Sequence, residues 1–104
     1  MSDLFRIRVM PEASDDVTNA FTYIEADSPQ NAASVLQELF DAIDSLERLP
    51  HRYKVHRSNR NPTRVVRSMP VPPFVIYYRV LEAERIVEVL TVRHGARKQP
   101  RRFK

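Results

Sequence analysis

The sequence contains no cysteine and no tryptophan, and it has a single glycine among its 104 residues. Without cysteine the chain has no disulfide bond, no thiol nucleophile and no thiolate ligand for a metal, which agrees with a reducing compartment. No stretch approaches the roughly 18 apolar residues that span a bilayer, and the charged, alternating residues 1–10 are unlike a signal peptide. The sequence therefore predicts a cytoplasmic protein that does not enter a membrane.

Acidic residues are scarce in the second half of the chain. Residues 1–47 carry two arginines against ten Asp and Glu, whereas residues 48–104 carry fifteen Lys and Arg against three Glu. The two parts therefore have net charges of −8 and +12. This asymmetry predicts an acidic helical surface beside a basic surface that meets an anionic partner, either a nucleic acid or an acidic peptide.

Apolar residues in the first half recur with two different periods. Residues 4–9 alternate between apolar and polar, which predicts a strand. From Pro11 onward the apolar residues recur at steps of three and four, which predicts an amphipathic helix with Asp15, Asp16 and Asn19 on its solvated face. A second helix begins with Ser28 as N-cap and Pro29 in the first helical position. Its apolar stripe is widened by Val35, Phe40 and Leu49, and Pro50 ends it.

The second half is predicted to be mainly strands. Residues 51–62 form a basic loop with a short strand at 53–56, and strands follow at 64–69, 74–81 and 85–94. A tight turn at 82–84 joins the last two strands as a hairpin. Three prolines (Pro70, Pro72 and Pro73) predict an irregular connector, and Gly95 is expected to adopt a positive φ angle.

These elements predict one α+β domain over residues 1–104 with a basic C-terminal tail at 96–104. An N-terminal strand precedes an antiparallel helical hairpin, which packs on a mostly antiparallel sheet of about four strands. The last strand is apolar on both faces and is therefore expected to be central. The aromatic side chains of Phe74, Tyr77 and Tyr78 are expected mostly in the core.

Three segments resemble a known family: the helical segment that ends in Leu49-Pro50, the strand Phe74-Val75-Ile76-Tyr77-Tyr78-Arg79-Val80, and the ending Val89-Leu90-Thr91-Val92-Arg93-His94-Gly95-Ala96-Arg97. Together they resemble the RelE/ParE toxins of type II toxin–antitoxin modules, also called plasmid stabilisation proteins. The resemblance covers nearly the whole chain. It implies a growth inhibitor that a cognate antitoxin neutralises.

Two activities share this fold, so the fold alone does not choose between them. RelE-type toxins cleave messenger RNA on the ribosome, and ParE-type toxins poison DNA gyrase. In the nuclease pattern an arginine stands where this chain has Val75, and a C-terminal tyrosine stands where it has Phe103. The ending His94-Gly95-Ala96-Arg97, followed by Pro100, looks more like the ParE type. The resemblance therefore favours a ParE-like gyrase poison without chemistry of its own.

Two sets of residues are candidates for function. If the protein were a nuclease, its catalytic residues would be His94, Arg97 and Arg67, with His94 as general base; the favoured interpretation of His94 is structural, as a cap on its strand. The residues expected to bind the target or a nucleic acid are Arg64, Arg67, Arg93, Arg97, Lys98 and Arg101, of which Arg64, Arg67, Arg93 and Arg97 are expected at one edge of the sheet. His51 and His56 have no carboxylates at ligand spacing, and neither a metal nor a cofactor is predicted.

The resemblance also implies partners. An antitoxin with an acidic, partly apolar tail is expected across the hairpin and sheet, and the target is either DNA gyrase or the ribosome with its mRNA. A third possibility is a non-toxic member that binds its antitoxin and represses transcription jointly with it. The sequence does not separate this possibility from a gyrase poison.

Overall fold

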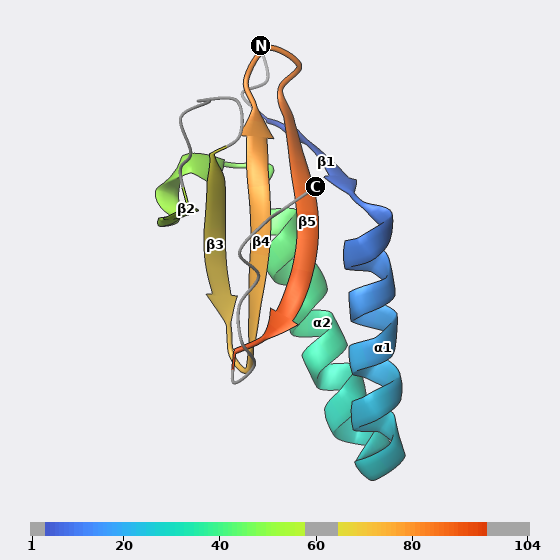
Figure 1. Ribbon diagram of the computed structural model, residues 1–104. Helices are drawn as coiled ribbons and strands as arrows, with labels where there is room; N and C mark the ends of the chain where they lie inside the picture. The colour runs from blue at the N-terminus through green and yellow to red at the C-terminus, as the bar shows by residue number, and fades with distance from the viewer. Residues whose placement is uncertain (1–3, 58–64, 96–104) are drawn as a thin grey trace.

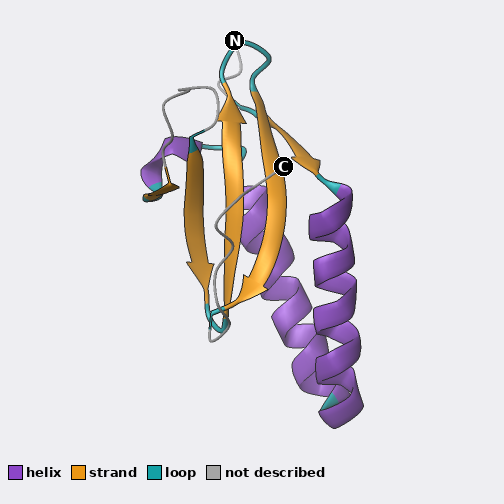
Figure 2. Ribbon diagram, in the orientation of Figure 1, coloured by secondary structure: helices purple, strands orange, loops and turns teal. Residues whose placement is uncertain are grey.

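The computed structural model describes residues 4–57 and 65–95 of the chain. Within these residues five strands form one sheet in the order β1-β5-β4-β3-β2, and a pair of antiparallel helices covers one of its faces (Figures 1 and 2). The predicted α+β fold is thus confirmed. The elements are β1 (Arg6–Val9), α1 (Pro11–Asp27), α2 (Pro29–Ser45), a 3-10 helix η1 (Pro50–Arg52), β2 (Val55–Arg57), β3 (Val66–Val71), β4 (Phe74–Leu81) and β5 (Ile86–His94).

The central position predicted for the last strand is confirmed. β5 pairs in parallel with β1, where Arg6 lies opposite Ile86 and Val9 opposite Val89, and it pairs antiparallel with β4. Apolar side chains on both of its faces are therefore buried, as a strand inside a sheet requires. The sheet is mixed because β1 returns through the helical hairpin before the antiparallel strands begin.

The helical hairpin forms as the capping residues Ser28 and Pro29 predict. The Oγ of Ser28 accepts a hydrogen bond from the Asn31 N–H at 3.3 Å, and Pro29 occupies the first turn of α2. One residue, Ser28, links the two helices, so they lie antiparallel (Figure 1). Their far end projects beyond the sheet.

The end of α2 differs from the prediction. The helix stops at Ser45, because the N–H groups of Leu46, Glu47 and Arg48 bond to carbonyls three residues earlier. Leu49 therefore lies outside the helix and is 73% exposed. Phe40 is also exposed, so neither residue widens the apolar stripe as expected.

The main core lies between the hairpin and the sheet. Leu39, Ile43 and Leu46 of the α2 region pack with Met69, Ile76 and Tyr78 of the sheet. Complete burial of one such aliphatic side chain contributes about 1.5–3 kcal/mol. A smaller cluster of Val66, Tyr77 and Leu90 lies on the other face. Phe74, Tyr77 and Tyr78 are all buried, as predicted.

Pro70 was predicted in an irregular connector but lies within β3, opposite Val75. The Ser68 N–H, two residues earlier, points away from β4 and bonds to the Lys54 carbonyl at 2.9 Å. By strand alternation the nitrogen of Pro70 also faces away from β4, so its missing N–H removes no bond from the β3–β4 ladder. Only Pro72 and Pro73 form the turn.

The prediction of a positive φ at Gly95 is wrong, since no glycine adopts one. Instead the Gly95 N–H donates to the Pro73 carbonyl at 2.7 Å, and a Cβ at this position would lie 3.2 Å from the same oxygen. Glycine is needed here for close backbone approach. Among the described residues, positive φ angles occur at Leu49 and at Arg85, which has φ of 54° in the β4–β5 turn over residues 82–85, at the other end of β5.

Within the described part of the chain, no helix is both long and apolar enough to cross a membrane.

Candidate functional site

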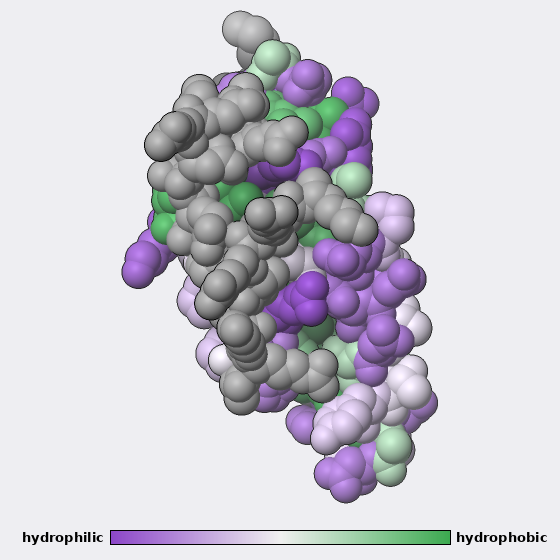
Figure 3. All heavy atoms as spheres, in the orientation of Figure 1, coloured by the Kyte–Doolittle hydropathy of each residue, from purple (hydrophilic) through white to green (hydrophobic). Residues whose placement is uncertain are grey.

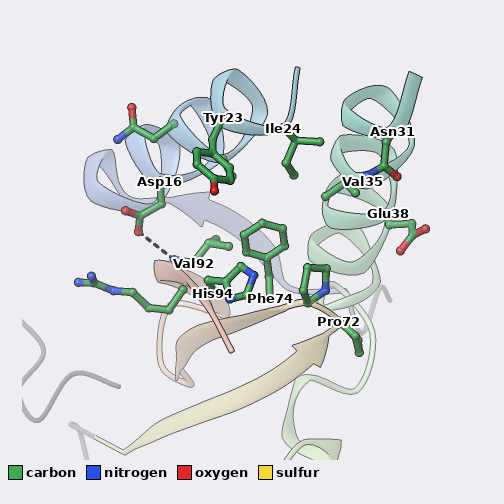
Figure 4. A pocket seen from close by; sticks show the side chains of 14 residues that line it. Asp16, Tyr23, Ile24, Asn31, Val35, Glu38, Pro72, Phe74, Val92 and His94 are labelled. Carbon is green, nitrogen blue, oxygen red and sulfur yellow. Dashed lines mark hydrogen bonds between the residues drawn. The ribbon is translucent and has the colours of Figure 1, made fainter. Parts of the chain in front are cut away.

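An open groove lies between the projecting end of the helical hairpin and the end of the sheet where β4 begins and β5 ends (Figure 4). Its volume is about 840 Å³. Phe74, Val92, Ile24 and Val35 give it an apolar interior, and polar residues surround them. The lining comprises Asp16, Asn19, Ala20, Tyr23, Ile24, Asn31, Val35, Glu38, Pro72, Pro73, Phe74, Val92, Arg93 and His94.

Asp16 fixes the end of β5 in this groove. Strand β1 ends at Val9, and the Met10 N–H makes the last backbone bond to β5, at the Val89 carbonyl. Beyond that point the Asp16 carboxylate accepts a hydrogen bond from the Thr91 hydroxyl at 2.5 Å. It also accepts one from the Val92 N–H at 2.9 Å (Figure 4). A side chain of α1 thus continues the pairing of β5 where the neighbouring strand stops.

This role of Asp16 was missed by the sequence analysis, which placed it on the solvated face of its helix. No local signal distinguishes it from Asp15, because the two carboxylates stand next to each other at the start of α1. Tyr23, which is 78% exposed at the groove, also escaped prediction. In Figure 3 the surface over α1 is mainly hydrophilic.

His94 and Arg93 lie at the end of β5 but on different faces of the sheet. The exposed His94 is opposite Phe74, and the two rings meet edge to face with centroids 5.6 Å apart. Arg93 is opposite Val75, which packs against the smaller cluster on the other face. Its Nε is buried and has no hydrogen-bond partner among the described residues.

Arg67 has a structural role in the described chain. Its guanidinium donates hydrogen bonds to the carbonyls of His51 at 3.1 Å and Tyr53 at 2.9 Å. Beside it the buried Tyr78 hydroxyl donates to the Pro50 carbonyl at 2.5 Å. Two side chains of the sheet therefore hold the backbone around η1 in place.

Burial raises the pKa of Tyr78 to about 12, although the nearby Arg67 opposes the shift. Because the native pKa lies above the ordinary value near 10, native Tyr78 keeps its proton more tightly than the unfolded chain does. Stability from this group is complete below pH 10 and is lost as the pH rises toward 12. We expect a loss of about 2 kcal/mol over this interval.

Urea unfolding of the wild type and of Tyr78→Phe at several pH values between neutrality and pH 12 tests this expectation. The variant should be less stable by about 1 kcal/mol at neutral pH, because the Pro50 carbonyl loses its donor. The difference between the two proteins should shrink above pH 10 and change sign by about pH 12, because only the wild type loses about 2 kcal/mol over this interval. A constant difference would contradict the assignment of the pH effect to Tyr78.

The predicted site residues do not form one cluster in the described chain. Arg67 pairs with Tyr78 of β4, and His94 pairs with Phe74 of the same strand. The backbones of Arg67 and His94 are therefore about 13 Å apart along the strands and about 10 Å apart across them. Arg67 and Arg93 lie on opposite faces, contrary to the single edge that was expected. Arg64, Arg97, Lys98 and Arg101 lie outside the described residues, as does Phe103.

Among the described residues, neither Arg67 nor Arg93 forms an ion pair with a glutamate. Glu88 instead binds Arg8 at 2.9 Å and Arg79 at 3.1 Å. His51 pairs with Glu82, and the side chain of His56 lies outside the described part. Among the described residues no group of three or more His, Cys, Asp or Glu is placed to hold a metal ion.

Comparison with known proteins gives consistent matches. Residues 7–99 match the family model described as the ParE toxin of the type II toxin–antitoxin system parDE. The chain is 32% identical over 95 residues to the toxin candidate Y4kP of Sinorhizobium fredii, covering 91% of this chain and 93% of that protein.

Two solved structures share the fold. A chain of the chromosomal ParDE system from P. aeruginosa has a TM-score of 0.70 at 17% identity and covers 89% of this chain and 98% of its own length. A chain of the archaeal RelE–RelB complex from Pyrococcus horikoshii has a TM-score of 0.66 at 11% identity, with 91% and 99% covered.

Proposed function

Because this chain belongs to the ParE toxin family of type II toxin–antitoxin systems, we propose that it inhibits growth by binding DNA gyrase in the cytoplasm, without catalytic chemistry of its own. A cognate antitoxin neutralises it.

The observation that carries this proposal is the placement of Arg67. A ribonuclease requires its base, its acid and its phosphate-binding groups within a few ångströms of one phosphodiester. Arg67 is engaged by two backbone carbonyls and lies well over 10 Å from His94. Val75, at the position of the nuclease arginine, packs against the cluster of Val66, Tyr77 and Leu90. The described residues thus support binding over cleavage.

The groove is the proposed antitoxin site. The structural relatives include a ParDE system and a RelE–RelB complex, in which a toxin and an antitoxin occur together. Apolar side chains of the antitoxin tail would fill the space over Phe74 and Val92, and its acidic side chains would meet Arg93 and His94 at the end of β5.

The test is to induce the chain alone in a bacterial host and to follow both mRNA integrity and the supercoiling of a reporter plasmid. Loss of supercoiling or broken DNA with intact transcripts is the expected result. Transcript cleavage that disappears in His94→Ala or Arg97→Ala would overturn the proposal in favour of a ribosome-dependent mRNA endonuclease. Normal growth with the chain folded would show a non-toxic member that only binds its antitoxin.

A further inference from the structure

A second surface, distant from the groove, lies at the opposite end of the sheet. The η1 segment, defined here as residues 48–55, connects α2 to β2. It contains no acidic residue, and Arg48, His51, Arg52 and Lys54 are all exposed. Leu49 and Val55 are exposed apolar side chains in the same segment. None of these residues belongs to the site described above.

The backbone of the η1 segment is held in position by side chains of the sheet. The carbonyls of Pro50, His51 and Tyr53 accept hydrogen bonds from side chains of β3 and β4, and Pro50 is itself buried. A surface that is ordered before binding loses less conformational entropy when a ligand arrives.

The arginine and lysine side chains of this segment, and Arg67 beside it, have no carboxylate partner among the described residues. The Arg52 guanidinium donates to the Ser45 hydroxyl at 3.0 Å and lies 5.0 Å from the centre of the Tyr53 ring. Within residues 4–57 and 65–95, the hydrogen bonds of the Arg67 guanidinium go to carbonyl oxygens. Arg48, Arg52, Lys54 and Arg67 form no ion pair with any described residue, whereas His51 pairs with Glu82. Four positive charges therefore remain without a carboxylate partner in this part of the chain.

Leu49 adds backbone strain to this surface. Its φ and ψ angles of 49° and 54° are left-handed, which costs a residue with a Cβ about 1–2 kcal/mol. The side chain is 73% exposed, so burial does not offset this cost. Strain of this kind is concentrated at binding sites. Here it presents an apolar side chain in a sequence flanked by Arg48 and Arg52.

We propose that the η1 segment binds double-stranded DNA. Arg48, Arg52 and Lys54 contact backbone phosphates, and Leu49 makes apolar contact within a groove of the duplex. Phosphate contacts need exposed cations without internal partners, and an apolar side chain between arginines resembles the side chains that architectural proteins place against base steps. The inference goes beyond the proposed function, because DNA binding by this segment does not require gyrase.

Fluorescence anisotropy of the purified full-length chain with a labelled random-sequence duplex of about 20 base pairs tests the proposal. The salt concentration is varied between roughly 50 and 200 mM. Arg48→Glu and Lys54→Glu should each weaken binding by about tenfold and reduce the salt slope by about one. The control is Gln30→Glu, which introduces the same glutamate at an exposed position at the start of α2, at the projecting end of the hairpin away from the η1 segment, and should weaken binding by less than about twofold.

Leu49→Ala provides a second, independent variant. It should weaken binding by about fivefold at every salt concentration and leave the slope unchanged, because an apolar contact releases no counterions. All four substitutions are at exposed positions, and circular dichroism verifies that each variant is folded.

Three results would overturn the proposal: no binding of the duplex, equal weakening by Arg48→Glu and Gln30→Glu, or Arg48-dependent binding of a poly-glutamate peptide in place of DNA. The last result would assign the segment to an acidic protein partner. A different result would refute the proposed function. A chain that binds DNA through Arg48 but leaves plasmid supercoiling intact in cells would refute the gyrase proposal and retain the DNA site.

Discussion

Replacing Asp16 with alanine is expected to lower the free energy of unfolding by about 3 kcal/mol. The carboxylate accepts two hydrogen bonds from β5, from the Thr91 hydroxyl and the Val92 N–H. Each bond to a charged acceptor contributes about 1.5–3 kcal/mol, and the substitution leaves both donors without a partner. Urea unfolding followed by circular dichroism measures the loss.

The neighbouring Asp15 is the matched control. Asp15→Ala removes the same charge from the same turn of α1, but Asp15 is exposed, so the expected change is within about 0.5 kcal/mol. Asp16→Asn should lie between the two, because its amide oxygen still accepts one bond. Equal effects of Asp15→Ala and Asp16→Ala would show that Asp16 acts through helix charge and not through β5.

The groove gives this prediction a functional consequence. Arg93 and His94 line the groove and directly follow Thr91 and Val92, the two residues that Asp16 holds. If the antitoxin binds there as proposed, a folded Asp16→Asn variant should bind it more weakly, since the end of β5 must then be ordered on binding.

Replacing Glu88 with alanine is expected to destabilise the protein by about 3 kcal/mol. The Glu88 side chain is only 9% exposed, and it joins Arg8 of β1 to Arg79 of β4 across β5. Arg79 is 19% exposed, so removing its carboxylate leaves a largely buried cation without that partner. Removing one partner of a buried ion pair lowers the free energy of unfolding by about 3–5 kcal/mol. Because Arg8 is partly exposed, we expect a loss at the lower end of this range.

Arg8→Ala separates burial from simple charge pairing. The Arg8 side chain is 52% exposed, so its contact with Glu88 should contribute less than about 1 kcal/mol. A double variant, Glu88→Leu with Arg79→Met, should recover most of the stability, because apolar side chains of similar volume remove both buried charges. If Glu88→Ala cost no more than Arg8→Ala, burial would not be the source of the effect.

Much of the fold was predictable because it depends on interactions between residues close in sequence. Three-to-four-residue spacing of apolar side chains predicted both helices, and Ser28 with Pro29 predicted where the second begins. Alternating and doubly apolar runs predicted β4 over 74–81 and the central position of β5. The same strand sequences carried the resemblance to the toxin family, which the family match over residues 7–99 confirms.

The errors arose where a residue's environment depends on distant parts of the chain. Pro70 fits inside β3 because its nitrogen faces away from β4, and only the order of the strands determines which way it faces. Gly95 is required by the approach of the Pro73 carbonyl, which the β4–β5 pairing brings to it.

The sequence by itself determined the class of fold and the order of the elements, because hydrophobic periodicity and local capping are properties of neighbouring residues. The family was indicated by the resemblance of three segments to known toxins, which the family match supports. Only the tertiary structure decided which polar side chains hold distant parts of the backbone through hydrogen bonds. Asp16 holds β5 although Asp15 beside it is exposed, and Arg67 binds the backbone around η1 at a distance from His94. The physical reason is that a hydrogen-bonding side chain takes its role from the partner that folding brings within about 3 Å, and in both cases that partner is remote in the sequence.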